Sequence, residues 1–199
     1  MPFFFHNTMQ DHQNKNYPSG NVERTQSSGN EAQIPSCSSE TCKNSERIKV
    51  GKYRLLTKQI AALIEGEHDA IAVMANVCAA IHEAMGFFWT GFYRVSGEEL
   101  VLGPFQGPVA CTHIGFGRGV CGTSWKERQS IVVPDVEAFP GRIACSSLSR
   151  SEIVVPVLSA DGTVRAVLDI DSKQLATFDD VDRQFLEDIC KMIASLLCV

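Results

Sequence analysis

The sequence has no long apolar run and no concentration of basic residues, and each absence excludes a class of protein. No apolar stretch approaches the ~20 residues that a membrane-spanning helix needs. Residues 3–5 are too short an apolar run for a signal peptide, and the N-terminus lacks both the basic leader of a signal peptide and the Arg content of a mitochondrial presequence. The chain has 18 Lys and Arg against 23 Asp and Glu, and its basic residues are scattered, whereas nucleic-acid binding needs a concentrated basic face. We therefore expect a cytoplasmic protein with no membrane and no nucleic-acid partner.

The sequence also lacks any CxxC pair, although it contains eight cysteines. The closest pair, Cys37 and Cys42, lies in a polar segment. Because structural zinc sites usually draw their ligands from closely spaced cysteines and histidines, we expect no metal site. Cytosolic thiols are kept reduced, so the cysteines are expected to be buried packing residues or redox catalysts rather than structural disulfides.

Leucine is absent from residues 1–47, which contain a single Val and a single Ile. Ser, Asn, Gln and charged residues dominate this segment, so it cannot bury enough apolar surface to offset the entropy lost on ordering. We expect residues 1–47 to form a disordered tail, in which Cys37 and Cys42 have no catalytic role. Residues 48–199 are expected to form one domain.

Three helices are predicted from apolar residues that recur every three or four positions. They span residues 51–64, the segment between an N-cap at Asp69 and Gly86, and a long segment after an N-cap at Asp179. The expected apolar faces are Tyr53, Leu55, Leu56, Ile60 and Leu63 in the first helix, Ile71, Met74, Cys78, Ile81 and Met85 in the second, and Val181, Phe185, Ile189, Ile193 and Leu197 in the third.

Short segments rich in β-branched and aromatic residues are predicted to be strands, at residues 87–95, 99–105, 131–133, 152–158 and 163–170. Tight turns join the first two and the last two, which makes each pair an antiparallel hairpin. Pro156 indicates an edge position or a bulge. Helices at both ends with antiparallel strands between them indicate an α+β domain, whose central antiparallel sheet is covered by helices mainly on one face.

Residues 117–122 spell GxGxxG, a pattern shared with dinucleotide-binding proteins. That function needs a strand before the motif, a long helix after it and a parallel βαβ unit around it. Here the helix predicted after the motif stops near Arg128, and the flanking strands pair as hairpins. The glycines indicate either a tight turn or a turn whose free backbone N–H groups hold a ligand carboxylate.

Cys111, Cys121 and Cys145 lie in turn-rich segments, unlike the cysteines on helical stripes. Cys121 falls in the first turn of a predicted helix, where the helix dipole would favour a thiolate. Cys145 is flanked by Arg142 and Arg150, whose positive charge would have the same effect. These positions leave redox chemistry open.

Several longer strings resemble the free methionine-(R)-sulfoxide reductase family. They are residues 102–107, 117–122, 135–141, 143–145, 149–156 and 168–172, and they occur in the family's order and spacing between Tyr53 and Leu197. The resemblance implies a GAF fold and an oxidoreductase that reduces free methionine-(R)-sulfoxide to methionine. The long polar N-terminus departs from the family pattern.

The resemblance also implies roles for the cysteines. Cys145 matches the catalytic cysteine, which attacks the sulfoxide sulfur and becomes a sulfenic acid. Cys111 matches the resolving cysteine, which forms a disulfide with it, and Cys121 matches an auxiliary or alternative resolving cysteine. No bound cofactor is implied, because a thioredoxin-like dithiol protein supplies the reducing equivalents.

Five further residues match the family's substrate pocket. Asp169 and Asp171 alternate along one strand and so share a face, as do Trp89 and Tyr93. Neighbouring carboxyl groups raise one another's pKa, so Glu152 or Asp171 is expected to donate the proton to the leaving oxygen, and Asp169 to hold the substrate ammonium. Trp89 is expected to pack on the S-methyl group and Tyr93 to add a hydroxyl contact. An enclosed pocket of this kind excludes peptide-bound methionine sulfoxide.

Alternatives remain at this point. His113 is expected to be an exposed strand residue rather than a base, since no partner for it is evident. A non-catalytic GAF sensor of a small molecule or of thiol redox state has the same fold and cysteines. The fold is also compatible with a homodimer, which the residues do not decide.

Overall fold

Six antiparallel strands form one sheet, in the order β3-β2-β1-β6-β5-β4. The computed structural model describes residues 40–143 and 145–197, and these fall in one compact unit. The strands are β1 Trp89–Ser96, β2 Glu99–Gln106, β3 His113–Gly115, β4 Ile131–Val133, β5 Ser151–Leu158 and β6 Val164–Ser172.

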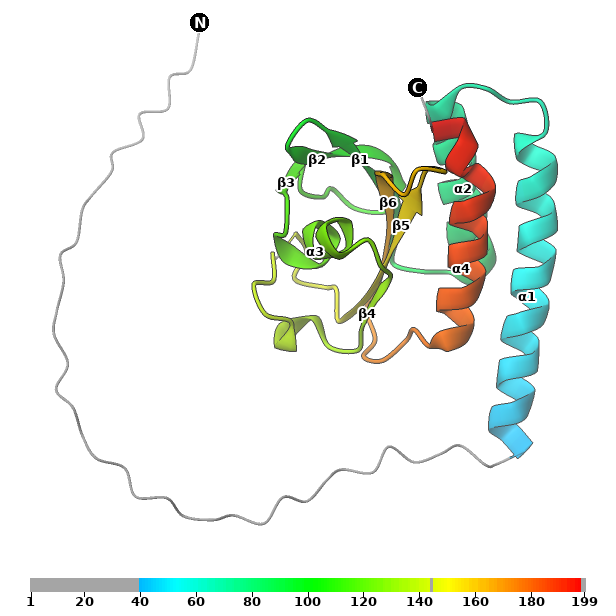
Figure 1. Cartoon of the computed structure of the whole chain (residues 1–199). Helices are drawn as coiled ribbons and strands as arrows, with labels where there is room; N and C mark the ends of the chain where they lie inside the picture. The colour runs from blue at the N-terminus through cyan, green and yellow to red at the C-terminus, as the bar shows by residue number, and fades with distance from the viewer. Residues whose placement is uncertain (1–39, 144, 198–199) are drawn as a thin grey trace, which may run out of the picture. The chain divides into compact units, whose positions relative to one another are not determined.

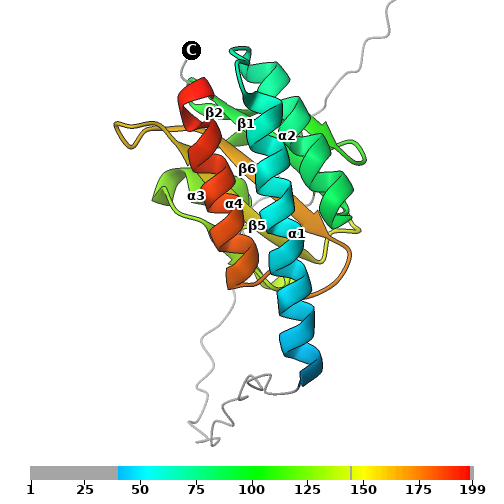
Figure 2. The ribbon, with the colours of Figure 1, turned by 90° about the vertical axis from the view of Figure 1, so that its right-hand side faces the viewer.

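Two helices, α2 Ala70–Met85 and α4 Asp180–Ile193, cover one face of this sheet, and a short helix lies against the other (Figure 1). The first helix, α1 Glu40–Ile64, packs on the outer side of α2 and α4, and Figure 2 shows it in front of them. On the opposite face lies α3 Gly119–Glu127, and short 3-10 helices span Val136–Ala138 and Ala194–Leu197. The predicted α+β architecture, with helices mainly on one face of an antiparallel sheet, is confirmed.

The helix boundaries follow from local hydrogen bonding. The Asp69 carboxylate accepts hydrogen bonds from the first backbone N–H groups of α2, and Gly86 ends this helix at φ 71°, a left-handed conformation that glycine adopts without strain. Asp179 and Asp182 form a reciprocal capping box at the start of α4. Both predicted N-caps are therefore confirmed.

The strand alternation divides the molecule into two apolar clusters. Side chains such as Phe92, Ile153 and Leu168 point toward α1, α2 and α4 and form the main core. Their neighbours along the same strands point to the opposite face, where a second cluster contains Trp89 and Tyr93. A one-residue step along any central strand thus separates the structural core from the other face of the sheet.

The first helix is longer than predicted. It begins at Glu40 rather than Gly51, so residues 40–47, which were assigned to the tail, are helical. Residues 40–50 contain no Gly or Pro, and a helix that is already anchored by packing extends readily through such a segment. Residues 1–39 and the side chain of Cys42 lie outside the described residues, so the expected disorder of the tail stays a prediction.

Three residues assigned to apolar helix faces are exposed instead. Leu55 is 62% exposed, Leu63 48% and Ile71 48%, whereas Tyr53, Leu56 and Ile60 are fully buried. Leu55 lies about 200° around the helix from Tyr53, so the two cannot share a buried stripe. For Leu55 and Leu63 the predicted apolar face was too wide, because α1 only has to meet α2 and α4.

Two local features of the sheet also bear on the predictions. Pro156 is accommodated because β4 pairs only with residues 152–154, which leaves the outer side of β5 unpaired beyond that point. His113 is exposed on β3, as expected, but it has a partner that the sequence did not indicate: its Nδ1 lies 3.0 Å from Oε2 of Glu99.

No described helix is long and apolar enough to cross a membrane.

Candidate active site

One row of side chains runs across three strands on the face of the sheet opposite α1, α2 and α4. In the strand register Asp171 of β6 lies opposite Trp89 of β1 on one side and opposite Glu152 of β5 on the other. In the adjacent row Asp169 lies opposite Gly91. The sheet therefore brings together residues that are far apart in sequence, and the period of two places Asp169 and Asp171 on one face, as predicted.

Gly91 makes room for the aromatic wall of this face. A Cβ atom at this position would lie 2.2 Å from the Trp89 ring and 2.6 Å from the Cβ of Phe105, so any other residue would displace the indole. Trp89 stacks on Phe105, with ring centroids 5.5 Å apart, and on Tyr93, at 6.0 Å. The predicted common face of Trp89 and Tyr93 is confirmed.

The polar atoms of these two aromatic residues hold a neighbouring loop. Trp89 Nε1 donates to the carbonyl oxygen of Pro108 at 3.0 Å, and the Tyr93 hydroxyl donates to that of Cys111, also at 3.0 Å. The Tyr93 hydroxyl was predicted to contact substrate. Its hydrogen bond fixes the segment that carries Cys111, and its contact with substrate stays a prediction.

The GxGxxG segment is a tight turn between β3 and α3. A Cβ at Gly122 would lie 2.4 Å from the carbonyl oxygen of Gly115, and Gly119 has φ 59°, so both positions require glycine. All strand pairs are antiparallel, so the parallel unit that a dinucleotide site needs is missing among the described residues. The turn directs Cys121 of α3 toward the carboxyl groups of β5 and β6.

Cys111 and Cys145 form a disulfide, with their Cα atoms 5.4 Å apart. It joins the loop after β2 to the loop before β5. In the latter loop Arg142 forms an ion pair with Glu137. The three remaining described cysteines, Cys78, Cys121 and Cys190, are free and buried.

A recess of about 650 Å³, its open mouth included, lies between the sheet, α3 and the Cys145 loop. Cys111 is not among its lining residues. The predicted site residues that do line it are Trp89, Tyr93, Cys121, Cys145, Glu152, Asp169 and Asp171.

Comparisons with known proteins identify this arrangement. Residues 67–197 match the GAF domain family. GAF domain-containing protein A of Dictyostelium discoideum is 54% identical over 146 residues, which cover 73% of this chain and 92% of that protein. The free methionine-R-sulfoxide reductase of Saccharomyces cerevisiae is 42% identical over 139 residues, covering 66% of this chain and 77% of that enzyme. The chain belongs to the free methionine-(R)-sulfoxide reductase family.

A solved structure supports the same assignment. The free methionine-R-sulfoxide reductase of Neisseria meningitidis, in complex with its substrate, superposes with a TM-score of 0.73 at 50% sequence identity. The match covers 75% of this chain and 90% of that one. The GAF fold predicted for this reductase-family chain is thereby confirmed.

The carboxyl groups of this family member have strongly perturbed acidities. Burial, followed by the charges of Asp169 and Asp171, raises the pKa of Glu152 well above its usual range. Burial and the charge of Asp171 raise the pKa of Asp169 likewise. For Asp171, burial raises the pKa to about 6, against the opposing effect of a hydrogen bond from Ser149. Shifts in this direction favour the protonated form of a carboxyl group, which is the form that donates a proton.

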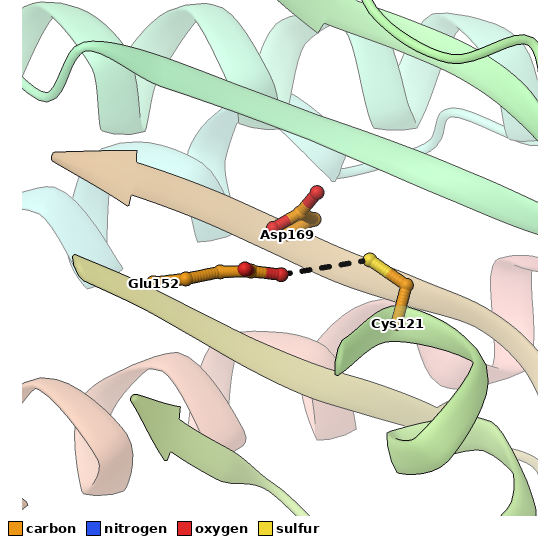
Figure 3. Close-up of side chains that lie close together, drawn as sticks. All are labelled: Cys121, Glu152 and Asp169. Atoms are coloured by element: carbon orange, nitrogen blue, oxygen red, sulfur yellow. Dashed lines mark hydrogen bonds between the residues drawn. The ribbon is translucent and has the colours of Figure 1, made fainter. Parts of the chain in front are cut away.

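Cys121 does not have the low pKa that its place in the first turn of a helix predicted. Burial, together with the charges of Asp169 and Glu152, raises the pKa of its thiol well above the usual value. Its Sγ lies 4.0 Å from Oε1 of Glu152, and Figure 3 shows both side chains directed toward Asp169. Burial and the neighbouring acids outweigh the helix dipole, which favours the neutral thiol of Cys121.

Two features of this cluster bear on what it binds. The Oδ1 atom of Asp169 is buried and accepts no hydrogen bond from any described residue, so it is available to a cationic group. Ligand atoms of Cys121, Glu152 and Asp169 also lie within 4.8 Å of one another, a set that a metal ion could use. Metal binding requires these groups to be deprotonated, which their raised pKa values oppose. Sequence spacing could not reveal this set, because it comes from three separate elements.

Several polar residues of the recess were not predicted from the sequence, among them Arg118 and Ser149. Arg118 lines it at the start of α3, and Ser149 lines it beside Asp171. Both lie in strings that resemble the family, but neither residue type at those positions carries a chemical signal by itself.

Proposed function

We propose that this protein reduces free methionine-(R)-sulfoxide to methionine, with Cys145 as nucleophile. The observation that carries the proposal is the common recess. Cys145 lines it together with Trp89, Glu152, Asp169 and Asp171, and its carboxyl groups have raised pKa values. Its relatives include enzymes named for this activity.

The first step needs a nucleophile and an acid together. The Cys145 thiolate attacks the sulfoxide sulfur, and a carboxylic acid protonates the departing oxygen, so that methionine leaves and Cys145 becomes a sulfenic acid. Glu152 is the favoured donor, because its pKa is raised well above the usual range whereas that of Asp171 is raised to about 6.

The second step returns the enzyme to its resting state. The Cys111 thiol attacks the sulfenic acid, releasing water and forming the disulfide, which a thioredoxin-like dithiol then reduces. The disulfide lies between Cys111 and Cys145, while Cys121 is a buried, neutral thiol. This favours Cys111 as the resolving cysteine. No bound cofactor is needed for these steps.

Selection of the free amino acid follows from the chemistry of the lining. The unpaired Oδ1 of Asp169 suits the substrate ammonium, and the Trp89 indole suits the S-methyl group. The backbone at the start of α3, where Gly119 and Val120 line the recess, suits the carboxylate. A peptide bond on either side of the methionine would remove one of these charges and clash with the walls.

We further propose a cytoplasmic location, where a dithiol reductant is available. Residues 48–199 remain the proposed catalytic domain, extended by the helical residues 40–47, and a homodimer remains a prediction.

The test is turnover with free methionine-(R)-sulfoxide, thioredoxin, its reductase and NADPH. We expect consumption of the R epimer, none of the S epimer or of peptide-bound sulfoxide, and complete loss in Cys145→Ser. A Cys190→Ser variant is the matched control, because Cys190 is buried in the core on the other face of the sheet. Binding of the sulfoxide without methionine release would instead indicate a sensor and overturn the proposal.

A further inference from the structure

The two cysteines of the disulfide face different surroundings. Cys145 lines the substrate recess, whereas Cys111 does not. Both cysteines are partly exposed, and the hydrogen bond from Tyr93 to the carbonyl oxygen of Cys111 holds the backbone of that residue. The disulfide therefore has an inner sulfur, at the recess, and an outer sulfur.

Exposed apolar side chains flank this disulfide on both of its chain segments. Val109, two residues before Cys111, is 87% exposed, and Leu148, three residues after Cys145, is 54% exposed. Ile143, two residues before Cys145, is 36% exposed. The disulfide brings the two segments together, with 5.4 Å between the Cα atoms of Cys111 and Cys145, and Val109 and Ile143 also line the recess. We call Val109, Ile143 and Leu148 the apolar rim.

Arg142, the residue before Ile143, forms an ion pair with Glu137. Clustered apolar side chains at a reactive group are typical of a protein-binding surface rather than of a solvated loop. The partner that must reach this group is the dithiol protein that reduces the disulfide, so the rim and the disulfide belong to one surface.

We propose that the dithiol reductant docks on the apolar rim and attacks the Sγ atom of Cys111, so that Cys145 is the leaving group. This rests on the function proposed above. The reductant thiolate forms a mixed disulfide with Cys111 while the Cys111–Cys145 bond breaks and its electron pair passes to Cys145 as a thiolate. The second thiol of the reductant then attacks its own sulfur in the mixed disulfide and releases Cys111, leaving the reductant as a disulfide.

The positions of the two cysteines explain the choice of sulfur. A protein reductant has to reach the sulfur that it attacks, and Cys145 lines the substrate recess whereas Cys111 does not. Attack on Cys111 also leaves the thiolate at Cys145, where the next substrate needs it.

Trapping the mixed disulfide tests the site of attack. The oxidised wild-type protein is mixed with a thioredoxin whose second active-site cysteine is replaced by serine, in the presence of iodoacetamide to alkylate the freed thiol. Mass spectrometry of the digest should find thioredoxin on Cys111 and the alkyl group on Cys145. Thioredoxin on Cys145 would overturn the proposal. Methionine release by the reduced protein in a single turnover, without thioredoxin, tests the proposed function separately.

A substitution on the rim tests docking. We expect Leu148→Asp to raise the KM for thioredoxin about tenfold, because a charge replaces an apolar contact, and to leave the rate of methionine release in a single turnover unchanged. Leu55→Asp is the matched control, since Leu55 is 62% exposed on α1, across the sheet. An equal KM for the two variants would show that the rim does not bind the reductant.

Discussion

At the scale of single residues, the acid cluster is costly to the fold and useful to the reaction. Glu152, Asp169 and Asp171 project from two neighbouring strands into one recess, where water no longer solvates them fully. Ionising all three together would concentrate like charge in a poorly solvated place. Protonation relieves this repulsion, so the same desolvation that weakens the apo fold prepares an acid for the leaving oxygen.

Replacing Glu152 by Gln tests its role as proton donor. Gln keeps the shape but has no proton to donate, so the single-turnover rate of methionine release should fall about 10²–10⁴-fold. In the wild type the acid form is the active one, so activity attributable to Glu152 is present below its raised pKa and lost as pH rises through it. The measurement is the rate of methionine release against pH.

The control for this substitution is Glu99→Gln, at an exposed position of β2. It should leave the rate and its pH profile unchanged. A different outcome would identify Asp171 as the donor: the Glu152→Gln variant would still lose activity at high pH, whereas the activity of the Asp171→Asn variant would no longer depend on pH in that range.

At the scale of elements, α1 is tied to α4 by a small buried polar network. Lys49 Nζ lies 2.8 Å from Asp179 and 2.6 Å from Asp182, and the Tyr53 hydroxyl donates to Asp182 at 2.8 Å. The Asp182 side chain is only 1% exposed. Since Tyr53 also stacks on Phe185, with ring centroids 5.0 Å apart, this network and the stack fix where the long helix crosses its neighbour.

Tyr53→Phe isolates the hydrogen bond from the stacking. The ring and its contact with Phe185 remain, but a buried oxygen of Asp182 loses its donor, which costs about 1–3 kcal/mol. We expect the free energy of unfolding, measured in urea, to fall by that amount. Lys191→Gln, which removes an exposed ion pair with Asp188, should change it by less than about 0.5 kcal/mol. Equal effects of the two variants would mean that the network does not stabilise the fold.

Elements with local signals were predictable, and those fixed by long-range packing were not. Asp69, Gly86 and Asp179 mark helix ends through their own hydrogen bonds and backbone preferences, and the structure confirms them. The start of α1 at Glu40 has no such signal, because its first turns are exposed and lie beyond the apolar stripe. The acidity of Cys121 was predicted wrongly for a related reason: the helix turn is local, but the acids that oppose it come from β5 and β6.

At the scale of the whole molecule, the sheet separates stability from chemistry. The main core fills the face under α1, α2 and α4, while the recess occupies the other face with its own smaller cluster. The alternation of side chains along the strands predicted which residues share a face. The resemblance of several sequence segments to the family predicted which of these residues form the substrate pocket. The alignment of Trp89, Asp171 and Glu152 in one row needed the register of three strands, which no local pattern supplies.

The disulfide lies at the recess but also affects the stability of the whole chain, because it closes a loop of 34 residues. Such a closure restricts the unfolded chain and stabilises the oxidised protein by about 2–4 kcal/mol. We expect a higher free energy of unfolding without reductant than with it, measured in urea at one temperature. Cys111→Ser retains every other cysteine of the chain and should show no dependence on reductant. Equal free energies of unfolding for the oxidised and reduced wild type would contradict this prediction. They would mean that strain in the closed loops offsets the effect of restricting the unfolded chain.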